Sequence, residues 1–114
     1  MRVFSFADDL VIAVYGATRS FPKEEQFGLT SQLRRAALSV PSNIVEGCAR
    51  SSEADYLRFL DMAYGSAREV EYQLHLALRL GFLNQQDYDA IDTKCDAVAM
   101  TLAGLIKSLR RQQA

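Results

Sequence analysis

The 114-residue sequence is poor in the residue types that build catalytic and metal sites. It has one histidine, His75, whereas di-iron helical bundles repeat a Glu-x-x-His motif on facing helices. Its two cysteines, Cys48 and Cys95, stand in no motif that would activate a thiol, and no glycine-rich phosphate loop is present. Glu69 and Glu71 cannot share a proton, because side chains two apart on a helix point in different directions. We therefore expect no enzymatic activity, no metal site, no cofactor and no small-molecule substrate.

The sequence also has few features of an exported or membrane-bound protein. Its start has one positive charge and a short apolar run that Asp8 and Asp9 interrupt, unlike a signal peptide. No segment approaches the ~18 apolar residues of a membrane span. Cys48 and Cys95 lack paired spacing, which favours buried, reduced thiols in an intracellular compartment. We expect a cytoplasmic protein with no membrane contact.

The composition is that of one globular domain, with 49% hydrophobic residues, 24% charged residues and only 2 prolines. A chain of this length buries roughly two thirds of its unfolded surface without disulfides or metals. We expect a single domain over residues 1–114. The net charge of −1 gives no overall attraction to nucleic acid, so any basic surface has to be local.

Two long segments of the second half have apolar residues at alternating steps of three and four, the spacing of helices in a bundle. Ser52 and Asn84 are the predicted N-caps, and Gly81 is the predicted left-handed residue after the first helix. The short link between Gly81 and Asn84 predicts an antiparallel hairpin. The seam positions are Tyr56, Leu60, Ala63, Ala67, Val70, Leu74 and Ala77, then Tyr88, Ile91, Cys95, Val98, Leu102, Leu105 and Leu109.

The first half is helical as well. One helix is predicted from Phe6 to near Phe21, one helical turn over residues 22–25, and a further helix from Leu29 or Thr30. Pro41 lies inside this last helix and removes one backbone hydrogen bond, so we predict a kink or break there. The predicted fold is all-α, an up-down antiparallel four-helix bundle whose second helix is kinked near Pro41.

Six polar side chains share one face of that second helix, and two interpretations of them remain open. One is a solvated surface in which Glu46 and Arg50 form an ordinary ion pair. The other, which we favour, is a polar network that fixes register or a subunit contact, because Asn43 lies beside the apolar seam. In it, Arg35 or Arg50 would pair with Glu69 of the next helix. The six residues are Gln32, Arg35, Ser39, Asn43, Glu46 and Arg50.

A second apolar stripe lies on the helix after Ser52. Its residues would extend the apolar surface beyond the single face that an isolated bundle helix needs, and self-association would cover it. The alternative, of equal weight, is that they widen contacts within one bundle. The stripe contains Phe59, Met62, Leu76 and Leu80.

Several ordered motifs resemble one bacterial family of four-helix bundles, often encoded within intervening sequences of large-subunit ribosomal RNA genes. The resemblance runs through residues 21–37 (FPKEEQFGLTSQLRRAA) and 39–47 (SVPSNIVEG) and extends roughly from residue 4 to residue 83. It continues in Arg50, Phe59, Leu60, Ala63, Gly65, Ser66, Glu69, Glu71, Gln73, Leu74 and Gly81.

This resemblance implies an up-down bundle that assembles as a ring-shaped homopentamer, with no known enzymatic activity and no defined role. The accessory protein of diversity-generating retroelements is similar in fold, and its basic pentameric barrel is associated with nucleic acid and a reverse transcriptase. By that analogy, the basic candidates for contact with nucleic acid are Arg34, Arg35, Lys107, Arg110 and Arg111.

We therefore expect a non-catalytic, homo-oligomeric binding or scaffold protein whose partner is RNA or an RNA-associated protein. Under this hypothesis the residues of the polar network are structural determinants of the bundle and of subunit contacts. The alternative, which the net charge favours, is a structural or protein-binding oligomer without affinity for nucleic acid.

Overall fold

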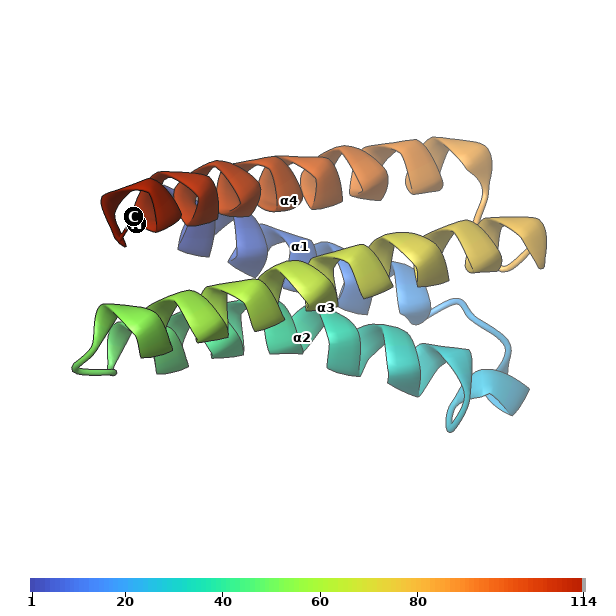
Figure 1. The fold of residues 1–114 in the computed structure, drawn as a ribbon. Coiled ribbons are helices and arrows are strands. Elements are labelled where there is room, and N and C mark those ends of the chain that lie inside the picture. Colours follow the sequence, from blue (N-terminus) through green and yellow to red (C-terminus); the bar gives the residue numbers. More distant parts are fainter. Residues whose placement is uncertain (114) are drawn as a thin grey trace.

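The computed structural model describes residues 1–113, which form four α-helices and one short 3-10 helix (Figure 1). Neighbouring helices run in opposite directions and enclose one core within a molecule of 46 × 24 × 19 Å. The predicted up-down four-helix bundle is confirmed. The elements are α1 (Arg2–Thr18), η1 (Lys23–Glu25), α2 (Leu29–Cys48), α3 (Glu53–Arg79) and α4 (Gln85–Gln113). None of the helices in the described residues has the length and hydrophobicity needed to span a membrane.

The predicted ends of α3 and α4 are confirmed by their hydrogen bonds. Ser52 Oγ accepts from the backbone N–H of Asp55 at 3.1 Å, and Asn84 Oδ1 accepts from the N–H of Asp87 at 2.8 Å. Gly81 has a φ of +81°, the left-handed conformation that glycine adopts without a steric cost. The N–H of Gly81 bonds the carbonyl of Leu78, and the next N–H bonds that of Ala77, which is a Schellman motif. The 81–84 link therefore reverses the chain tightly.

Helix α1 lies a few residues earlier in the chain than predicted. It starts at Arg2 because Val3, which is 2% exposed, belongs to the buried stripe. It ends at Thr18, whose hydroxyl donates to the carbonyl of Val14 at 2.8 Å. The predicted turn after Pro22 is confirmed as η1. The buried stripe of α1 consists of Val3, Ala7, Leu10, Val14 and Thr18.

Helix α2 runs unbroken from Leu29 to Cys48 with buried Pro41 inside it, so the chain does not break there and the kink stays a prediction. The glycine in its seam, Gly47, permits a close approach to α3. A Cβ at this position would lie 3.0 Å from the Cβ of Phe59 and 3.1 Å from Cδ1 of Tyr56. Because glycine has no side chain, α2 and α3 can pack closely together at Gly47.

The predicted seams of α3 and α4 form the centre of the core. Six of the seven α3 positions are buried, and on α4 the buried seam runs through Ile91, Cys95, Val98 and Leu102. Near the end of α4 the buried position is Ile106, whereas Leu105 is only partly buried. A helix with 3.6 residues per turn drifts about 20° per seven-residue repeat, which moves the core-facing position by one residue.

Candidate functional site

Three polar side chains link α2 to α3 inside one chain. The hydroxyl groups of Ser39 and Ser66 lie 2.9 Å apart. The side-chain amide of Asn43 donates to Ser39 Oγ at 3.0 Å and to the Ser39 carbonyl at 2.8 Å. Ser39, Asn43 and Ser66 are all partly buried. This part of the predicted polar line is therefore a hydrogen-bonded network between helices.

The remaining residues of the polar line lie on the surface. Arg50 donates to Glu46 at 2.9 Å, and both side chains are about half exposed, as the solvated-surface interpretation expects. The guanidinium of Arg50 also lies over the ring of Phe59, 4.9 Å from its centroid. Arg35 and Glu69 are exposed and line the same shallow groove between α2 and α3.

The expected ion pair of Glu69 with Arg35 or Arg50 is absent from the part of the chain that the structure describes. Among residues 1–113, the ion pairs within 4.0 Å are Arg50–Glu46, Arg58–Asp55, Arg68–Glu71 and Arg110–Asp61. Arg50, two residues after the end of α2, bonds Glu46 of that helix, and Glu69 lines the open groove. An exposed ion pair adds little stability, so the helices pack without it.

The basic residues proposed for nucleic-acid contact do not share one surface. Arg34 is held against α1: its Nε donates to Thr18 Oγ1 at 2.8 Å, and its guanidinium lies 4.7 Å from the ring centroid of Tyr15. Arg34 therefore connects α1 with α2. It lies with Arg35 toward the start of α2, the end of the bundle opposite to the end of α4 (Figure 1).

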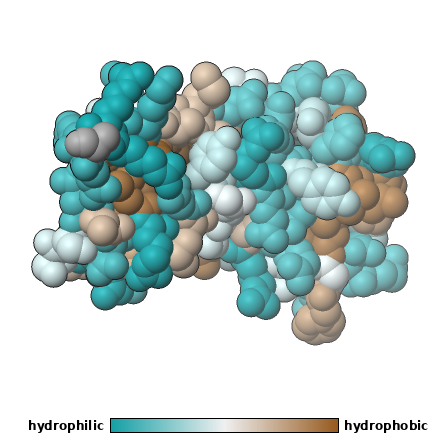
Figure 2. Space-filling view, viewed as in Figure 1, coloured by the Kyte–Doolittle hydropathy of each residue, from teal (hydrophilic) through white to brown (hydrophobic). Residues whose placement is uncertain are grey.

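The three basic residues at the end of α4 do come together, around an open groove of about 580 Å³ between α3 and α4. We call it the basic groove. Figure 2 shows hydrophobic surface enclosed by hydrophilic surface at this end of the molecule. Arg110 donates a hydrogen bond to the carboxylate of Asp61 and so joins the two walls. The groove is lined by Asp61, Tyr64, Ala103, Ile106, Lys107, Arg110 and Arg111.

Two of the lining residues, Asp61 and Tyr64, were not predicted from the sequence. Asp61 stands between the apolar residues Leu60 and Met62, and Tyr64 stands between Ala63 and Gly65, so neither is marked as a binding residue by its neighbours. Only the antiparallel hairpin places them opposite the last turns of α4. Counting equal distances outward from the Gly81 turn would not have paired these segments, because Asp61 lies 20 residues before Gly81 and Arg110 lies 29 residues after it.

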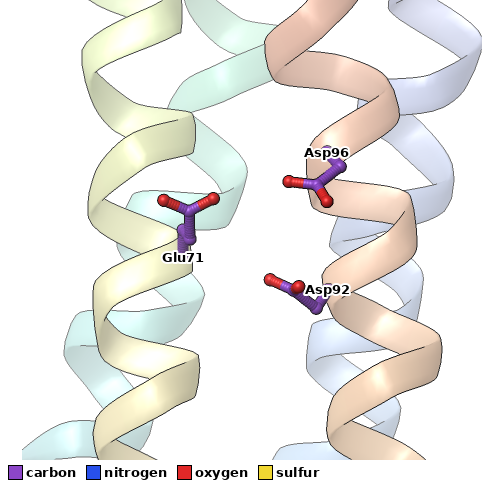
Figure 3. A group of neighbouring side chains, drawn as sticks. All are labelled: Glu71, Asp92 and Asp96. Atoms are coloured by element: carbon purple, nitrogen blue, oxygen red, sulfur yellow. The ribbon is translucent and has the colours of Figure 1, made fainter.

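A second group the sequence did not indicate is a set of three carboxylates where α3 faces α4. One oxygen from each of Glu71, Asp92 and Asp96 lies within 4.8 Å of the others (Figure 3). Oxygen ligands suit Mg²⁺ or Ca²⁺, and water would have to complete the six or more positions that these ions require. Glu71 also bonds Arg68 at 3.2 Å, which balances part of the negative charge.

The Asp92 carboxyl is partly buried among other carboxylates, and its pKa is shifted. Burial raises the pKa of the Asp92 carboxyl above its ordinary value, and the charges of Asp96, Glu71 and Asp89 raise it further. His75 on α3 opposes this shift. Within the described residues, Asp92 Oδ1 is buried without a hydrogen-bond partner. The α3–α4 contact therefore holds a carboxylate whose charge is unfavourable there.

The two thiols differ from each other, and the expectation that both are buried is wrong for one. Cys95 is buried, and its Sγ donates to the carbonyl of Ala67 at 3.3 Å. Burial raises the pKa of this thiol to about 12, so it is unreactive. Cys48 is exposed at the end of α2, next to buried Gly47.

The comparisons with known proteins agree with the bundle. The chain is similar to a crystal structure of a protein of unknown function from the S23 ribosomal protein family of Bacteroides thetaiotaomicron, with a TM-score of 0.86 and 24% identity. That alignment covers 92% of this chain and 98% of the other, and it shows a shared fold. No curated protein matches the sequence. The model of the family described as 23S rRNA-intervening sequence protein matches residues 1–104, nearly the whole chain. This chain therefore belongs to the family of 23S rRNA-intervening sequence proteins.

Proposed function

We propose that this protein is a non-catalytic binding or scaffold bundle that self-associates and contacts RNA through the basic groove. The observation that carries the proposal is the convergence of Lys107, Arg110 and Arg111 around one open groove. Basic side chains bind the phosphate backbone by neutralising its charge and releasing counterions, and a local cluster can do this although the net charge is −1. The description of the family refers to an intervening sequence of ribosomal RNA, so RNA is the first partner to test.

Self-association is supported by apolar side chains that the single bundle leaves exposed. Phe4 of α1 and Leu38 and Val45 of α2 line an open groove beside Pro41, and Leu38 and Val45 are about half exposed. In the second stripe, Met62 on α3 and Leu80 just after it are 44% and 53% exposed, whereas Leu76 is partly buried and Phe59 is buried. Contiguous exposed apolar surface is a feature of interaction sites, and the groove beside Pro41 provides it. We propose the homopentameric ring that the resemblance implies.

RNA binding is measured by fluorescence anisotropy at low and at moderate salt, after light scattering has established the mass of the assembly relative to the 12.7 kDa chain. We expect micromolar or tighter binding that weakens as salt is raised. Lys107→Glu combined with Arg111→Glu should abolish it. Arg110 is left unchanged because it holds Asp61.

A matched control reverses two exposed charges at the other end of the bundle, Arg19→Glu with Lys23→Glu. This variant has the same net charge as the test variant, so a loss confined to the test variant assigns binding to the basic groove. Equal losses in both variants would mean that only the overall charge matters and would contradict the groove as the contact.

The second candidate function is a structural or protein-binding oligomer without affinity for RNA. The net charge of −1 and the apolar groove at Phe4, Leu38 and Val45 favour it. Absence of RNA binding at low salt, together with an intact assembly, would select this function. The partner search would then start from the apolar groove, where Leu38→Glu should prevent assembly or partner capture.

A further inference from the structure

We infer that the basic groove takes an unpaired nucleotide of single-stranded RNA, with its base against Tyr64 and its phosphates on Lys107 and Arg111. This inference rests on the proposed function, which names RNA but not its form. The inference goes further in two ways. The RNA is single-stranded and not duplex, and one of its bases occupies the apolar interior of the groove.

The interior of the groove is what selects an unpaired base. Tyr64 is partly buried, Ile106 is buried, and the small side chain of Ala103 leaves the space above them open. The volume of about 580 Å³ lies within the range of about 300–1,000 Å³ typical of small-ligand pockets. A base can stack on an aromatic side chain in such a groove, because every base has an exposed π-face once it is unpaired.

A duplex has nothing to place in this groove. The bases of double-stranded RNA are stacked inside the helix, and proteins recognise it by its shape, its phosphates and its 2′-hydroxyls. A surface built for a duplex needs cations but no apolar hollow between them. The basic groove has such a hollow, which a purely electrostatic contact would leave empty.

The charges around the groove divide into a structural cation and two available ones. Arg110 is engaged by Asp61 and ties the end of α4 to α3. Lys107 and Arg111 have no ion-pair partner within residues 1–113, and both are exposed. They are four residues apart on α4 and so lie on the same face of the helix. This places two available positive charges beside the open interior, where the phosphates flanking a bound base would lie.

The test compares two RNA probes with the same number of nucleotides, an unstructured oligonucleotide and a blunt-ended self-complementary duplex without a loop, by fluorescence anisotropy with the full chain. We expect the unstructured probe to bind roughly fivefold or more tightly, since each stacked base adds to the backbone contacts. Tyr64→Phe should keep this preference, because phenylalanine retains the aromatic ring. Tyr64→Leu should remove it.

A second variant tests the interior without removing an aromatic side chain from the bundle. Ala103 is exposed, and Ala103→Leu should fill the groove, weaken binding of the unstructured probe and leave duplex binding unchanged. Ala90→Leu, at another exposed position of α4, is the control and should change neither. Thermal melts of all variants separate loss of binding from loss of folding.

The possible failures of the two proposals are distinct. Equal, salt-sensitive binding of both probes, unchanged in Ala103→Leu, would overturn the single-strand inference and leave the proposed function standing. If neither probe binds, both the single-strand inference and the proposed function are overturned.

Discussion

The hydroxyl groups of Ser39 and Ser66 lie 2.9 Å apart across the contact between α2 and α3. The Asn43 amide donates to Ser39 Oγ, so the hydroxyl proton of Ser39 is available for Ser66. A slide of α2 along α3 would break this chain of donors and acceptors, and the partly buried groups would lose their partners. The network therefore selects one register within the chain.

The link between Ser39 and Ser66 predicts coupling in a double-mutant cycle. Ser39→Ala and Ser66→Ala should each lower the free energy of unfolding by about 1 kcal/mol, the net contribution of one such hydrogen bond. Together they should lower it by less than the sum, with a coupling of about 0.5–1 kcal/mol, because both remove the same bond. Chemical denaturation of the four proteins measures this, and strictly additive effects would contradict the bond.

The close approach at Gly47 predicts opposite effects for two glycine-to-alanine substitutions. Alanine stabilises a helix interior by about 1 kcal/mol relative to glycine. At Gly65 on α3 a Cβ would meet no atom within 4 Å, so Gly65→Ala should raise the free energy of unfolding by about that amount. At Gly47 the Cβ would press on Phe59 Cβ and on Tyr56 Cδ1. Overpacking of this kind costs about 1–3 kcal/mol, which outweighs the helical gain.

Urea denaturation of Gly47→Ala, Gly65→Ala and the parent protein compares the two sites directly. We expect Gly47→Ala to be the least stable and Gly65→Ala the most stable of the three. Stabilisation by Gly47→Ala equal to that of Gly65→Ala would mean that α2 and α3 separate easily at this point.

The helices and their ends could be predicted because the signals are local in the sequence. Ser52, Asn84 and Gly81 act through hydrogen bonds and dihedral angles within a few residues of themselves, so their positions in the chain were sufficient. The seam spacing likewise determines which residues face the core. This argument weakens near the end of α4, where the buried residue is Ile106 and not the predicted Leu105. A straight helix has 3.6 residues per turn, so a regular seven-residue repeat does not stay on one face over the whole helix.

The side-chain groups between helices could not be predicted in the same way. Arg34 was grouped with Arg35 as a neighbour in the sequence, yet it bonds Thr18 across the α1–α2 contact. The carboxylates of Asp92 and Asp96 meet Glu71 only because the hairpin aligns α3 with α4. Such groupings depend on the axial offset and rotation of one helix against another. Those quantities are set by packing and not by the sequence spacing within either helix.

The two thiols should react at very different rates. Cys48 is exposed, whereas Cys95 is buried, donates to Ala67 and has a pKa raised by burial to about 12. We expect a thiol reagent to modify one cysteine in the folded protein and both in denaturant, because only a thiolate reacts. In Cys48→Ser the folded protein should be unreactive. Rapid modification of that variant would show that the core around Cys95 opens easily.

The carboxylates at the α3–α4 contact predict that Asp92→Asn stabilises the protein. Burial and the charges of Asp96, Glu71 and Asp89 raise the pKa of Asp92 above its ordinary 3.8. A folded-state pKa above the unfolded one means that the protonated form is favoured by folding. The resulting stability is fully present below the unfolded pKa and is lost as the pH rises through the folded-state pKa.

At about pH 7 the parent protein has lost this contribution, and the amide of Asp92→Asn avoids the loss. The variant should be more stable there by about 0.5 kcal/mol, the scale of a like-charge pair four residues apart on a helix. Near pH 3 the difference should shrink, because Asp92 is then protonated. Urea denaturation at both pH values measures it, with Asp8→Asn on the exposed surface of α1 as a control of equal charge. Equal effects of the two substitutions would attribute the gain to net charge, whereas an effect confined to Asp92→Asn assigns it to the burial of the Asp92 carboxylate and its repulsion by Asp96 and Glu71.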